Sequence, residues 1–350
     1  MMKQIWVKSS GGRYPVFIGR NLIGKVGPLM KRGWARNGFK SPFESKIMIV
    51  TQDKVARYHL QELRRSFKRA GFKVVVHVVP DGEKTKSEKQ LFRLYRGLVK
   101  NDFERRDTLV ALGGGVVGDL VGFAASTYLR GIAFVNVGTT LLAQVDSSIG
   151  GKTGINLAEG KNLVGTFYPP KMVVSDIDVL ATLPDREFRA SMAEVVKYGV
   201  IRDARLFRLL ELRGHQIMAR NSNALFAAIE ACARIKADVV SRDEKEVKGE
   251  RMILNYGHTF GHALEQVTGY QKMMHGEAVA LGMICAARLA VYLGILSGDE
   301  ETRQARLISR FGLPVSMSRF RLVIDDLLRA MMRDKKKSAG HLRYVLPEGI

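Results

Sequence analysis

The chain has 350 residues, which is enough for two domains of ordinary size. Hydrophobic residues make up 46% and charged residues 26%, and this globular composition excludes a disordered, collagen-like or low-complexity protein. Lys and Arg outnumber Asp and Glu by 56 to 34, a net charge of +22 that favours an anionic partner: nucleic acid, a membrane surface or a phosphorylated metabolite.

Cysteine content and hydropathy indicate a cytoplasmic protein without a membrane partner. Two cysteines, Cys232 and Cys285, are too few for a disulfide framework and favour a reducing compartment. The first residues lack the apolar stretch of a secretory signal. The most apolar segment, 278–287, has ten residues, whereas a membrane span needs about 20.

The first half of the chain alternates predicted strands with amphipathic helices. The predicted strands are Val- and Ile-rich runs, typical of strands buried on both faces: 46–50, 73–79, 108–112, 132–137 and 172–176. Helical patterns at 55–71 and 89–101 separate them, so we predict a doubly wound parallel sheet. An N-terminal hairpin is predicted from 4–9 and 14–19.

The pattern becomes helical after Leu183, and only 341–347 reads as a further strand. The sequence therefore predicts an α/β fold with two domains. An N-terminal doubly wound parallel-sheet nucleotide-binding domain spans 1–183, and an α-helical C-terminal domain that binds metal and substrate spans 184–350.

A glycine-rich turn follows the predicted strand 108–112. Gly113, Gly115 and Gly118 fit the G-x-G-x-x-G spacing, which lets backbone N–H groups approach a diphosphate at a helix N-terminus. Alone, the pattern is equally consistent with close helix–strand packing. Polar turns at 51–53, 81–86 and 138–140 also follow predicted strands, where open parallel sheets bind ligands, and together these turns favour a nucleotide.

Three of the seven histidines fall close together and indicate a metal site. The spacing of His258 and His262 places both on one helix face, and geometry alone nominates them as the ligand pair. His275 opens the next helical pattern. The carboxylate ligand could be Glu194, Glu265 or Glu277, and spacing does not choose among them.

A set of basic residues suggests anion binding. Lys152 and Lys161 are expected on a glycine-rich loop, and glycines around Lys152 suit a loop folded over an anion. Lys197, Lys236 and Arg251 complete the set, although most such residues lie on solvated surfaces. Nucleotide, metal and lysines together indicate hydride chemistry on a phosphorylated, hydroxylated substrate.

Long motifs resemble the 3-dehydroquinate synthase family. They run in order as GGGVVGDLVGFAASTYLRG (113–131), VDSSIGGKTG (145–154), MAEVVKYG (192–199), LNYGHTFGHALE (254–265) and HGEAVALGM (275–283). The resemblance implies conversion of 3-deoxy-D-arabino-heptulosonate 7-phosphate into 3-dehydroquinate and phosphate in the shikimate pathway. It also implies an NAD- and metal-dependent lyase reaction with transient oxidation, phosphate elimination, reduction and intramolecular aldol closure.

The resemblance also implies site residues and partners. The metal, Zn²⁺ or Co²⁺, would be held by Glu194, His258 and His275, so that His262 belongs to the substrate pocket. A homodimer is implied, with Arg130 reaching the neighbouring subunit's site. The remaining substrate contacts would be Asp146, Lys152, Asn162, Lys197, Lys236, Glu246, Arg251, Asn255, His262 and Lys336. NAD would contact Asp81, Gly82, Glu83, Lys84, Thr85, Lys86, Gly115, Val116, Val117, Gly118, Asp119, Thr139, Thr140, Lys152, Lys161, Val179, Leu180, Ala181 and Thr182.

The match departs from the family pattern at Gly138, at Gln52 and by one extra residue within 247–250. Three alternatives remain. Another sugar phosphate cyclase would vary the motifs at 145–154 and 254–265, and a metal-dependent polyol dehydrogenase would lack the lysine set and release NADH. A nucleic-acid-binding protein would cluster its basic residues with stacking aromatics, whereas here they are dispersed and aromatics are 8%.

Overall fold

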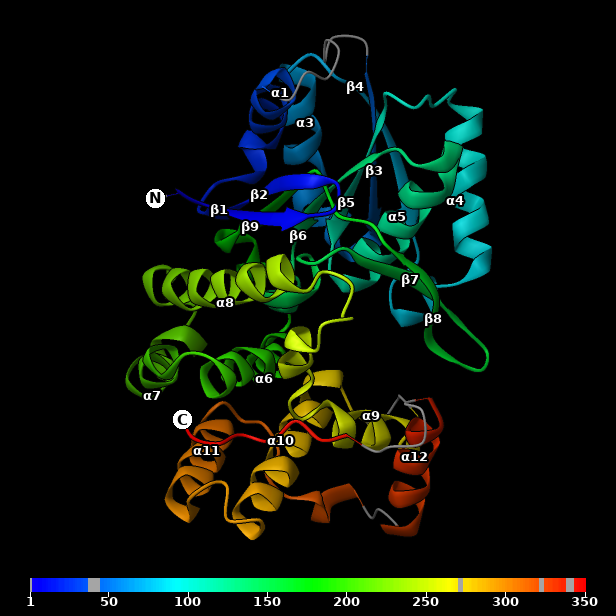
Figure 1. Ribbon diagram of the computed structural model, residues 1–350. Coiled ribbons are helices and arrows are strands. Elements are labelled where there is room, and N and C mark those ends of the chain that lie inside the picture. Colours follow the sequence, from blue (N-terminus) through cyan, green and yellow to red (C-terminus); the bar gives the residue numbers. More distant parts are fainter. Residues whose placement is uncertain (1, 37–44, 270–272, 321–323, 338–342) are drawn as a thin grey trace. The chain divides into compact units, whose positions relative to one another are not determined.

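The computed structural model describes residues 2–36, 45–269, 273–320, 324–337 and 343–350. These residues form two compact units. Unit 1 comprises 1–183 and 236–245, and unit 2 comprises 184–235 and 246–350. Figure 1 labels their helices and strands.

Unit 1 is built on a seven-stranded sheet in the order β1-β2-β9-β6-β5-β3-β4. All neighbours pair in parallel except β1 and β2, which form the predicted N-terminal hairpin. Each predicted strand of the first half is present, so the α/β expectation is confirmed. The strands are β1 (Met2–Ser9), β2 (Gly12–Gly19), β3 (Lys46–Gln52), β4 (Lys73–Val79), β5 (Thr108–Gly113), β6 (Ala133–Gly138) and β9 (Met172–Asp176).

Helices cover both faces of this sheet, as a doubly wound fold requires. On one face Ile49, Val110 and Val135 pack with α1 (Val26–Arg36) and α3 (Gln61–Arg69). On the other face the strand residues in between, such as Met48 and Leu109, pack with α4 (Glu88–Lys100) and α5 (Gly115–Thr127). Burial on both faces explains why the strand sequences are almost uninterrupted apolar runs.

A second, two-stranded antiparallel sheet was not predicted. It consists of β7 (Lys152–Leu157) and β8 (Gly160–Phe167). The expectation that Lys152 and Lys161 sit on a glycine-rich loop is therefore wrong, because Lys152 begins β7 and Lys161 lies in β8. Close backbone approach explains the glycines: a Cβ at Gly165 would lie 2.1 Å from the Thr153 carbonyl oxygen.

Unit 2 is helical. Side chains cap several of these helices: Asp203 accepts hydrogen bonds from the Arg205 and Leu206 N–H groups, and Ser297 accepts one from Glu300 N–H. The predicted strand at 341–347 is wrong for 343–347, which are irregular, and 341–342 lie outside the described residues. The helices are α6 (Asp185–Ile201), α7 (Ala204–Met218), α8 (Ser222–Arg242), α9 (His258–Val267), α10 (His275–Tyr292), α11 (Gly298–Arg310) and α12 (Ile324–Lys337).

The end of α8 belongs to unit 1 although the sequence assigns 184–350 to one domain. The N-terminal hairpin holds this segment: Lys8 N–H donates to Ser241 Oγ at 2.9 Å, and Ser10 N–H donates to Glu244 at 2.7 Å. Among the described residues, no helix is both long and apolar enough to cross a membrane.

Candidate active site

Three helices of unit 2 bring a carboxylate and two imidazoles together. Glu194 lies in the middle of α6, His258 begins α9 and His275 begins α10. One ligand atom from each lies within 4.8 Å of the others. The Nε2 atoms of both histidines face the same carboxylate oxygen, Glu194 Oε1, each at 3.4 Å. Two imidazoles and one carboxylate are a donor set that suits Zn²⁺ or Co²⁺ and leaves a coordination position open.

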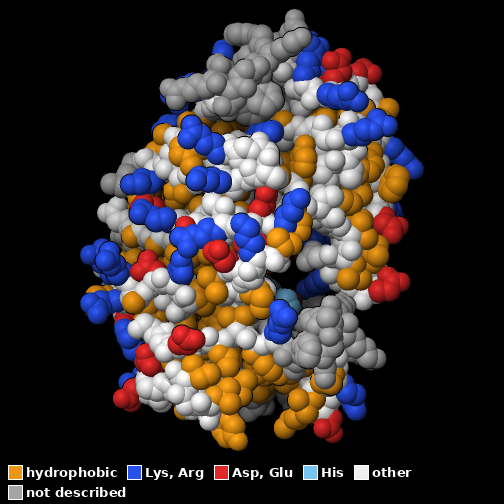
Figure 2. Space-filling model, in the orientation of Figure 1, with side chains coloured by type: hydrophobic (Ala, Val, Ile, Leu, Met, Phe, Trp, Pro, Cys, Tyr) orange, Lys and Arg blue, Asp and Glu red, His pale blue; other side chains and the backbone are white. Residues whose placement is uncertain are grey.

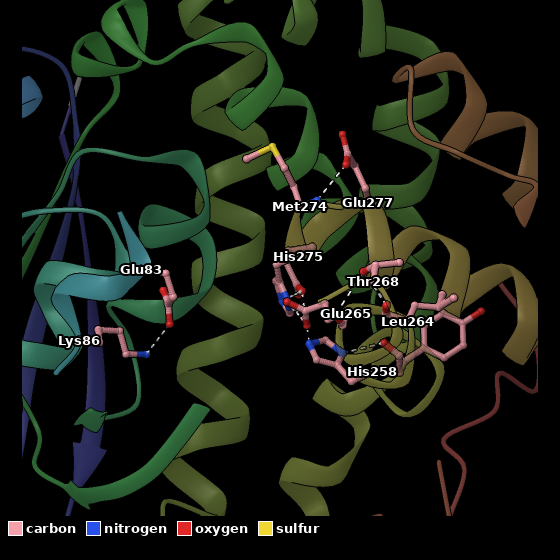
Figure 3. Close-up of polar contacts among 11 residues, drawn as sticks. Glu83, Lys86, His258, Leu264, Glu265, Thr268, Met274, His275 and Glu277 are labelled. Atoms are coloured by element: carbon pink, nitrogen blue, oxygen red, sulfur yellow. Dashed lines mark hydrogen bonds and ion pairs between the residues drawn. The ribbon is translucent and has the colours of Figure 1, made fainter. Parts of the chain in front are cut away.

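The other ring nitrogen of each histidine is held by a second group. His258 Nδ1 lies 3.1 Å from the Tyr256 carbonyl oxygen, and His275 Nδ1 lies 3.3 Å from Glu265 Oε2 (Figure 3). With a proton on Nδ1, each imidazole donates in its contact and turns Nε2 toward Glu194, the usual arrangement of metal-bound histidines. No sequence pattern signals the Tyr256 contact, because a backbone oxygen makes it.

Spacing alone predicted His258 and His262 as a ligand pair. Among the described residues, these two histidines do not occur together in one candidate group. His262 instead joins Glu265 and His275 in a second, more exposed group. The reason is that His258 is the first residue of α9 and its Nδ1 contact with the backbone turns Nε2 toward α6. Glu277 is a helix-capping residue, since it accepts from Met274 N–H and from Arg186.

Charge around this cluster is strongly coupled. Lys197, one turn after Glu194 on α6, is buried and forms an ion pair with it. Burial, together with the Lys197 charge, lowers the pKa of His258 to about 3. Burial acts on His275 in the same direction, but its contacts with Glu194 and Glu265 outweigh burial and raise the pKa of His275 to about 9. Without a metal, His275 is therefore protonated at neutral pH, and a cation bound at Nε2 would replace that proton.

Unit 2 also carries other residues that the resemblance assigns to substrate. Arg251 is buried, and its Nε lies 3.7 Å from Glu246 Oε1, so a carboxylate steadies this guanidinium. Asn255 ends the 3₁₀ turn before α9 and is exposed, as is His262. Lys336 lies in the last turn of α12, and its side chain lies outside the described residues.

In unit 1, the predicted nucleotide residues follow the carboxyl ends of four parallel strands of one sheet. Residues 81–86 follow β4, 115–119 open α5 after β5, Thr139 and Thr140 follow β6, and 179–182 follow β9. The chain turns from β3 outward to β4 and then back to β5 on the other side of β3. Open α/β sheets bind ligands at such a switch point, so these residues fit a dinucleotide.

The glycines after β5 allow close packing, and one of them begins α5 without a capping side chain. A Cβ at Gly118 would lie 2.9 Å from Asn136 Nδ2, and one at Gly114 would lie 2.9 Å from the Thr140 methyl. Close packing therefore accounts for these two. Gly114 is also the N-cap residue of α5, so no N-cap side chain covers the first N–H groups of that helix.

A buried lysine ties the turn at 81–86 to α5 and to the β7–β8 hairpin. Lys86 is 4% exposed, and its Nζ donates to Asp119 Oδ2 at 2.7 Å and to Asn162. Glu83 Oε1 lies 3.6 Å from the same Nζ (Figure 3). Burial raises the pKa of Asp119 to about 6 although Lys86 opposes the shift. Lys86 therefore fixes the shape of the turn, whereas Lys84 is exposed.

Three further contacts brace this edge of unit 1. Lys236 Nζ, from α8, donates to Asp146 at 2.6 Å, and Asp146 lies in the π-helical turn Ala143–Ser147. Gln52, a departure from the family pattern, donates its side-chain amide to the Pro80 carbonyl at 3.0 Å and so holds the start of the turn at 81–86. Gly138 accepts a hydrogen bond from Gln144 at 3.0 Å, which anchors the turn that carries Thr139 and Thr140.

Arg130 lies in an unusual backbone arch after α5. Leu129, Arg130 and Gly131 all have positive φ, at 50°, 66° and 122°. Such conformations cost free energy in residues with a Cβ and concentrate at functional sites. The Arg130 side chain is exposed.

Comparisons with known proteins agree with this geometry. Models of the 3-dehydroquinate synthase N-terminal and C-terminal regions match residues 76–190 and 191–337. The 3-dehydroquinate synthase of Desulforamulus reducens is 45% identical over 349 residues, which covers 100% of this chain and 94% of the relative. This chain belongs to the 3-dehydroquinate synthase family. The resemblance found in the sequence motifs is confirmed.

Solved structures agree with the 3-dehydroquinate synthase fold. The 2-epi-5-epi-valiolone synthase ValA from Streptomyces hygroscopicus, with NAD⁺ and Zn²⁺ bound, has a TM-score of 0.85 at 26% identity and covers 96% of this chain and 90% of its own. A 2-deoxy-scyllo-inosose synthase with carbaglucose-6-phosphate, NAD⁺ and Co²⁺ has a TM-score of 0.81 at 25% identity, over 99% and 93%. Both are related cyclases.

Proposed function

We propose that this chain is a 3-dehydroquinate synthase that converts 3-deoxy-D-arabino-heptulosonate 7-phosphate into 3-dehydroquinate and phosphate. The observation that carries the proposal is the match of nearly the whole chain to a curated 3-dehydroquinate synthase at 45% identity. The donor cluster of Glu194, His258 and His275 supports it, because two related cyclases were solved with NAD⁺ and Zn²⁺ or Co²⁺. A cytoplasmic location stays a prediction from the sequence.

The metal would be held by Glu194 and by Nε2 of His258 and His275, and NAD by the turn residues of unit 1. When bound, the metal acidifies a substrate hydroxyl and NAD accepts and returns a hydride. Lys197 would limit the negative charge on Glu194, and the Nδ1 contacts would orient both imidazoles so that Nε2 can bind the metal. The reaction is a carbon–oxygen lyase reaction, because phosphate leaves by elimination.

Basic residues would bind the anionic groups of the substrate. Arg251 and Lys236 are each preset by a carboxylate, Glu246 and Asp146, so little side-chain entropy is lost on binding. Lys152 is exposed at the start of β7. From the motif resemblance, we assign it to the substrate phosphate. Fixed cations stabilise negative charge as it develops on a departing phosphate.

The distribution of basic residues on one face of the molecule does not favour a nucleic-acid-binding function there. On the face in Figure 2, Lys and Arg side chains are scattered among apolar and acidic ones and do not form one continuous stripe. The strongly basic composition has no structural explanation.

Phosphate release tests the proposed activity. The purified protein should release phosphate from the heptulosonate phosphate only with NAD⁺ and a divalent metal, and Glu194→Gln should abolish it. Sedoheptulose 7-phosphate serves as the comparison substrate, since a sister cyclase would prefer it. If phosphate were released from sedoheptulose 7-phosphate and not from the heptulosonate phosphate, the proposed substrate would be rejected.

We further propose a homodimer in which Arg130 acts in the partner's site, supported by its exposed arch of three positive-φ residues. Subunits of Arg130→Ala and His275→Ala are mixed under conditions that exchange them. Hybrid dimers then hold one intact site, and recovery should approach about a quarter of wild-type activity. Exchange without recovery would show that Arg130 acts within its own subunit or not at all.

A further inference from the structure

Glu265 is a buried carboxylate of α9 that the proposed mechanism does not use as a ligand. It is 4% exposed, and its Oε2 lies 3.3 Å from His275 Nδ1 (Figure 3). His275 Nε2, on the opposite side of the same ring, lies 3.4 Å from Glu194 Oε1. Two carboxylates from different helices therefore contact the two nitrogens of one imidazole.

We propose that Glu265 is a positioning residue, which holds His275 in the tautomer and ring orientation that present Nε2 to the metal. The proposal rests on the proposed function only in that a metal occupies the Glu194, His258 and His275 cluster. Orientation matters at this residue because the His275 side chain is 35% exposed, so packing does not fix its ring on every side.

The competing assignment makes Glu265 a ligand. His262, Glu265 and His275 also offer ligand atoms within 4.8 Å of one another. Three observations favour the positioning role. Glu194 is buried and faces Nε2 of two histidines. His258 Nδ1 contacts a backbone carbonyl, just as His275 Nδ1 contacts Glu265. His262, the remaining histidine of the competing group, is exposed. In the group of Glu194, His258 and His275, both imidazoles are thus oriented by an oxygen atom at Nδ1.

A carboxylate that accepts from Nδ1–H of a metal-bound histidine makes that ligand more basic and prevents rotation of the ring. Loss of such a partner weakens metal binding by about 10- to 100-fold without removing a ligand. Loss of a ligand removes stoichiometric binding. The two roles therefore differ in the stoichiometry of metal binding, which can be measured without an assay of catalytic activity.

The experiment compares the metal affinity of four full-length variants with that of the wild type. Zn²⁺ dissociation constants are measured by chelator competition, and the Co²⁺-loaded proteins are compared by visible absorption. The variants are Glu265→Ala, Glu265→Gln, Glu194→Gln and the control Glu211→Gln, which alters a carboxylate of unit 2 that binds Arg303.

We expect Glu265→Ala to bind one Zn²⁺ about 10- to 100-fold more weakly, with the coordination class of the Co²⁺ spectrum kept. Glu265→Gln should lose less, because its amide oxygen can still accept from Nδ1–H. Glu194→Gln should lose stoichiometric binding, and Glu211→Gln should match the wild type. If the alanine variant does not fold, the isosteric glutamine variant decides the question.

Two results would overturn the proposal. Stoichiometric binding that is lost in Glu265→Gln but kept in Glu194→Gln would make Glu265 a ligand of the second group. Affinities of both Glu265 variants within twofold of the wild type would show that Glu265 does not position His275. Neither result depends on phosphate release, so a failure of the proposed function is recognised separately.

Discussion

Replacing Gly276 with Ala tests whether the close contact between α10 and α6 fixes the distance between His275 and Glu194. A Cβ at Gly276 would lie 1.8 Å from the Ala190 carbonyl oxygen and 2.5 Å from its carbon. Gly276 adjoins His275, and Ala190 lies one helical turn before Glu194 on α6. In the Gly276→Ala variant the two helices must therefore separate between Glu194 and His275, two of the residues proposed to hold the metal.

The size of the effect follows from these distances. Real Cβ atoms essentially never approach closer than 3.0 Å, so the helices must move apart by about 1.2 Å at this point. Overpacking of a core usually costs about 1–3 kcal/mol. A shift of this size also exceeds the roughly 0.2 Å tolerance of metal–ligand distances, so we expect at least about a tenfold loss of Zn²⁺ affinity.

The assay measures the Tm of the metal-free protein and the Zn²⁺ dissociation constant. Gly298→Ala is the matched control, because it also lies in the first turn of a helix and its Cβ would meet no atom within 4 Å. We expect a lower Tm and weaker Zn²⁺ binding for Gly276→Ala and no loss for the control. Wild-type values for Gly276→Ala would refute the link between this helix contact and the metal cluster.

Three further perturbations test other parts of the account. Because burial raises the folded-state pKa of Asp119 to about 6, above its unfolded value, this carboxyl costs stability as pH rises from about 4 to 6. The free energy of unfolding in urea is therefore measured without nucleotide at pH 4 and at pH 7. Between these pH values, the difference between Asp119→Asn and the wild type should shift by on the order of 2 kcal/mol in favour of the variant. A difference that does not change with pH would contradict this prediction. Tyr256→Phe removes a buried hydroxyl bonded to Gln304 Oε1 at 2.9 Å and should cost about 1–3 kcal/mol in the same unfolding measurement; an unchanged midpoint would contradict that cost. Lys152→Ala should lower kcat/KM by roughly a hundredfold to a few thousandfold if Lys152 contacts the phosphate, whereas an unchanged value would place it on the solvated surface.

The parallel sheet could be predicted from sequence because its strands are buried on both faces. Apolar runs such as 108–112 leave few other interpretations, and the helices between them show a clear amphipathic pattern. The β7–β8 hairpin could not be predicted in this way. Most of β8 is exposed, and both strands contain glycines needed for close backbone contact, so neither shows the usual strand pattern.

The metal cluster shows the limit of spacing as a guide. An i, i+4 interval predicted His258 and His262 as ligands because it considers one helix at a time. The structure joins Glu194 and His275 from two other helices to His258, and a backbone carbonyl turns its ring toward them. Tertiary contacts of this kind leave no periodic signal: the residues offered Glu194 and His275 among several candidates, and only the resemblance of whole motifs selected them.

The fate of NAD during turnover tests the central claim most directly. The metal-loaded protein is given the heptulosonate phosphate in large excess over NAD⁺, and phosphate release and NADH absorbance are followed together. A 3-dehydroquinate synthase returns the hydride in each cycle, so phosphate should exceed added NAD⁺ many-fold while NADH does not accumulate. One NADH formed per turnover, with reaction stopping when NAD⁺ is exhausted, would contradict the account and make the protein a polyol dehydrogenase.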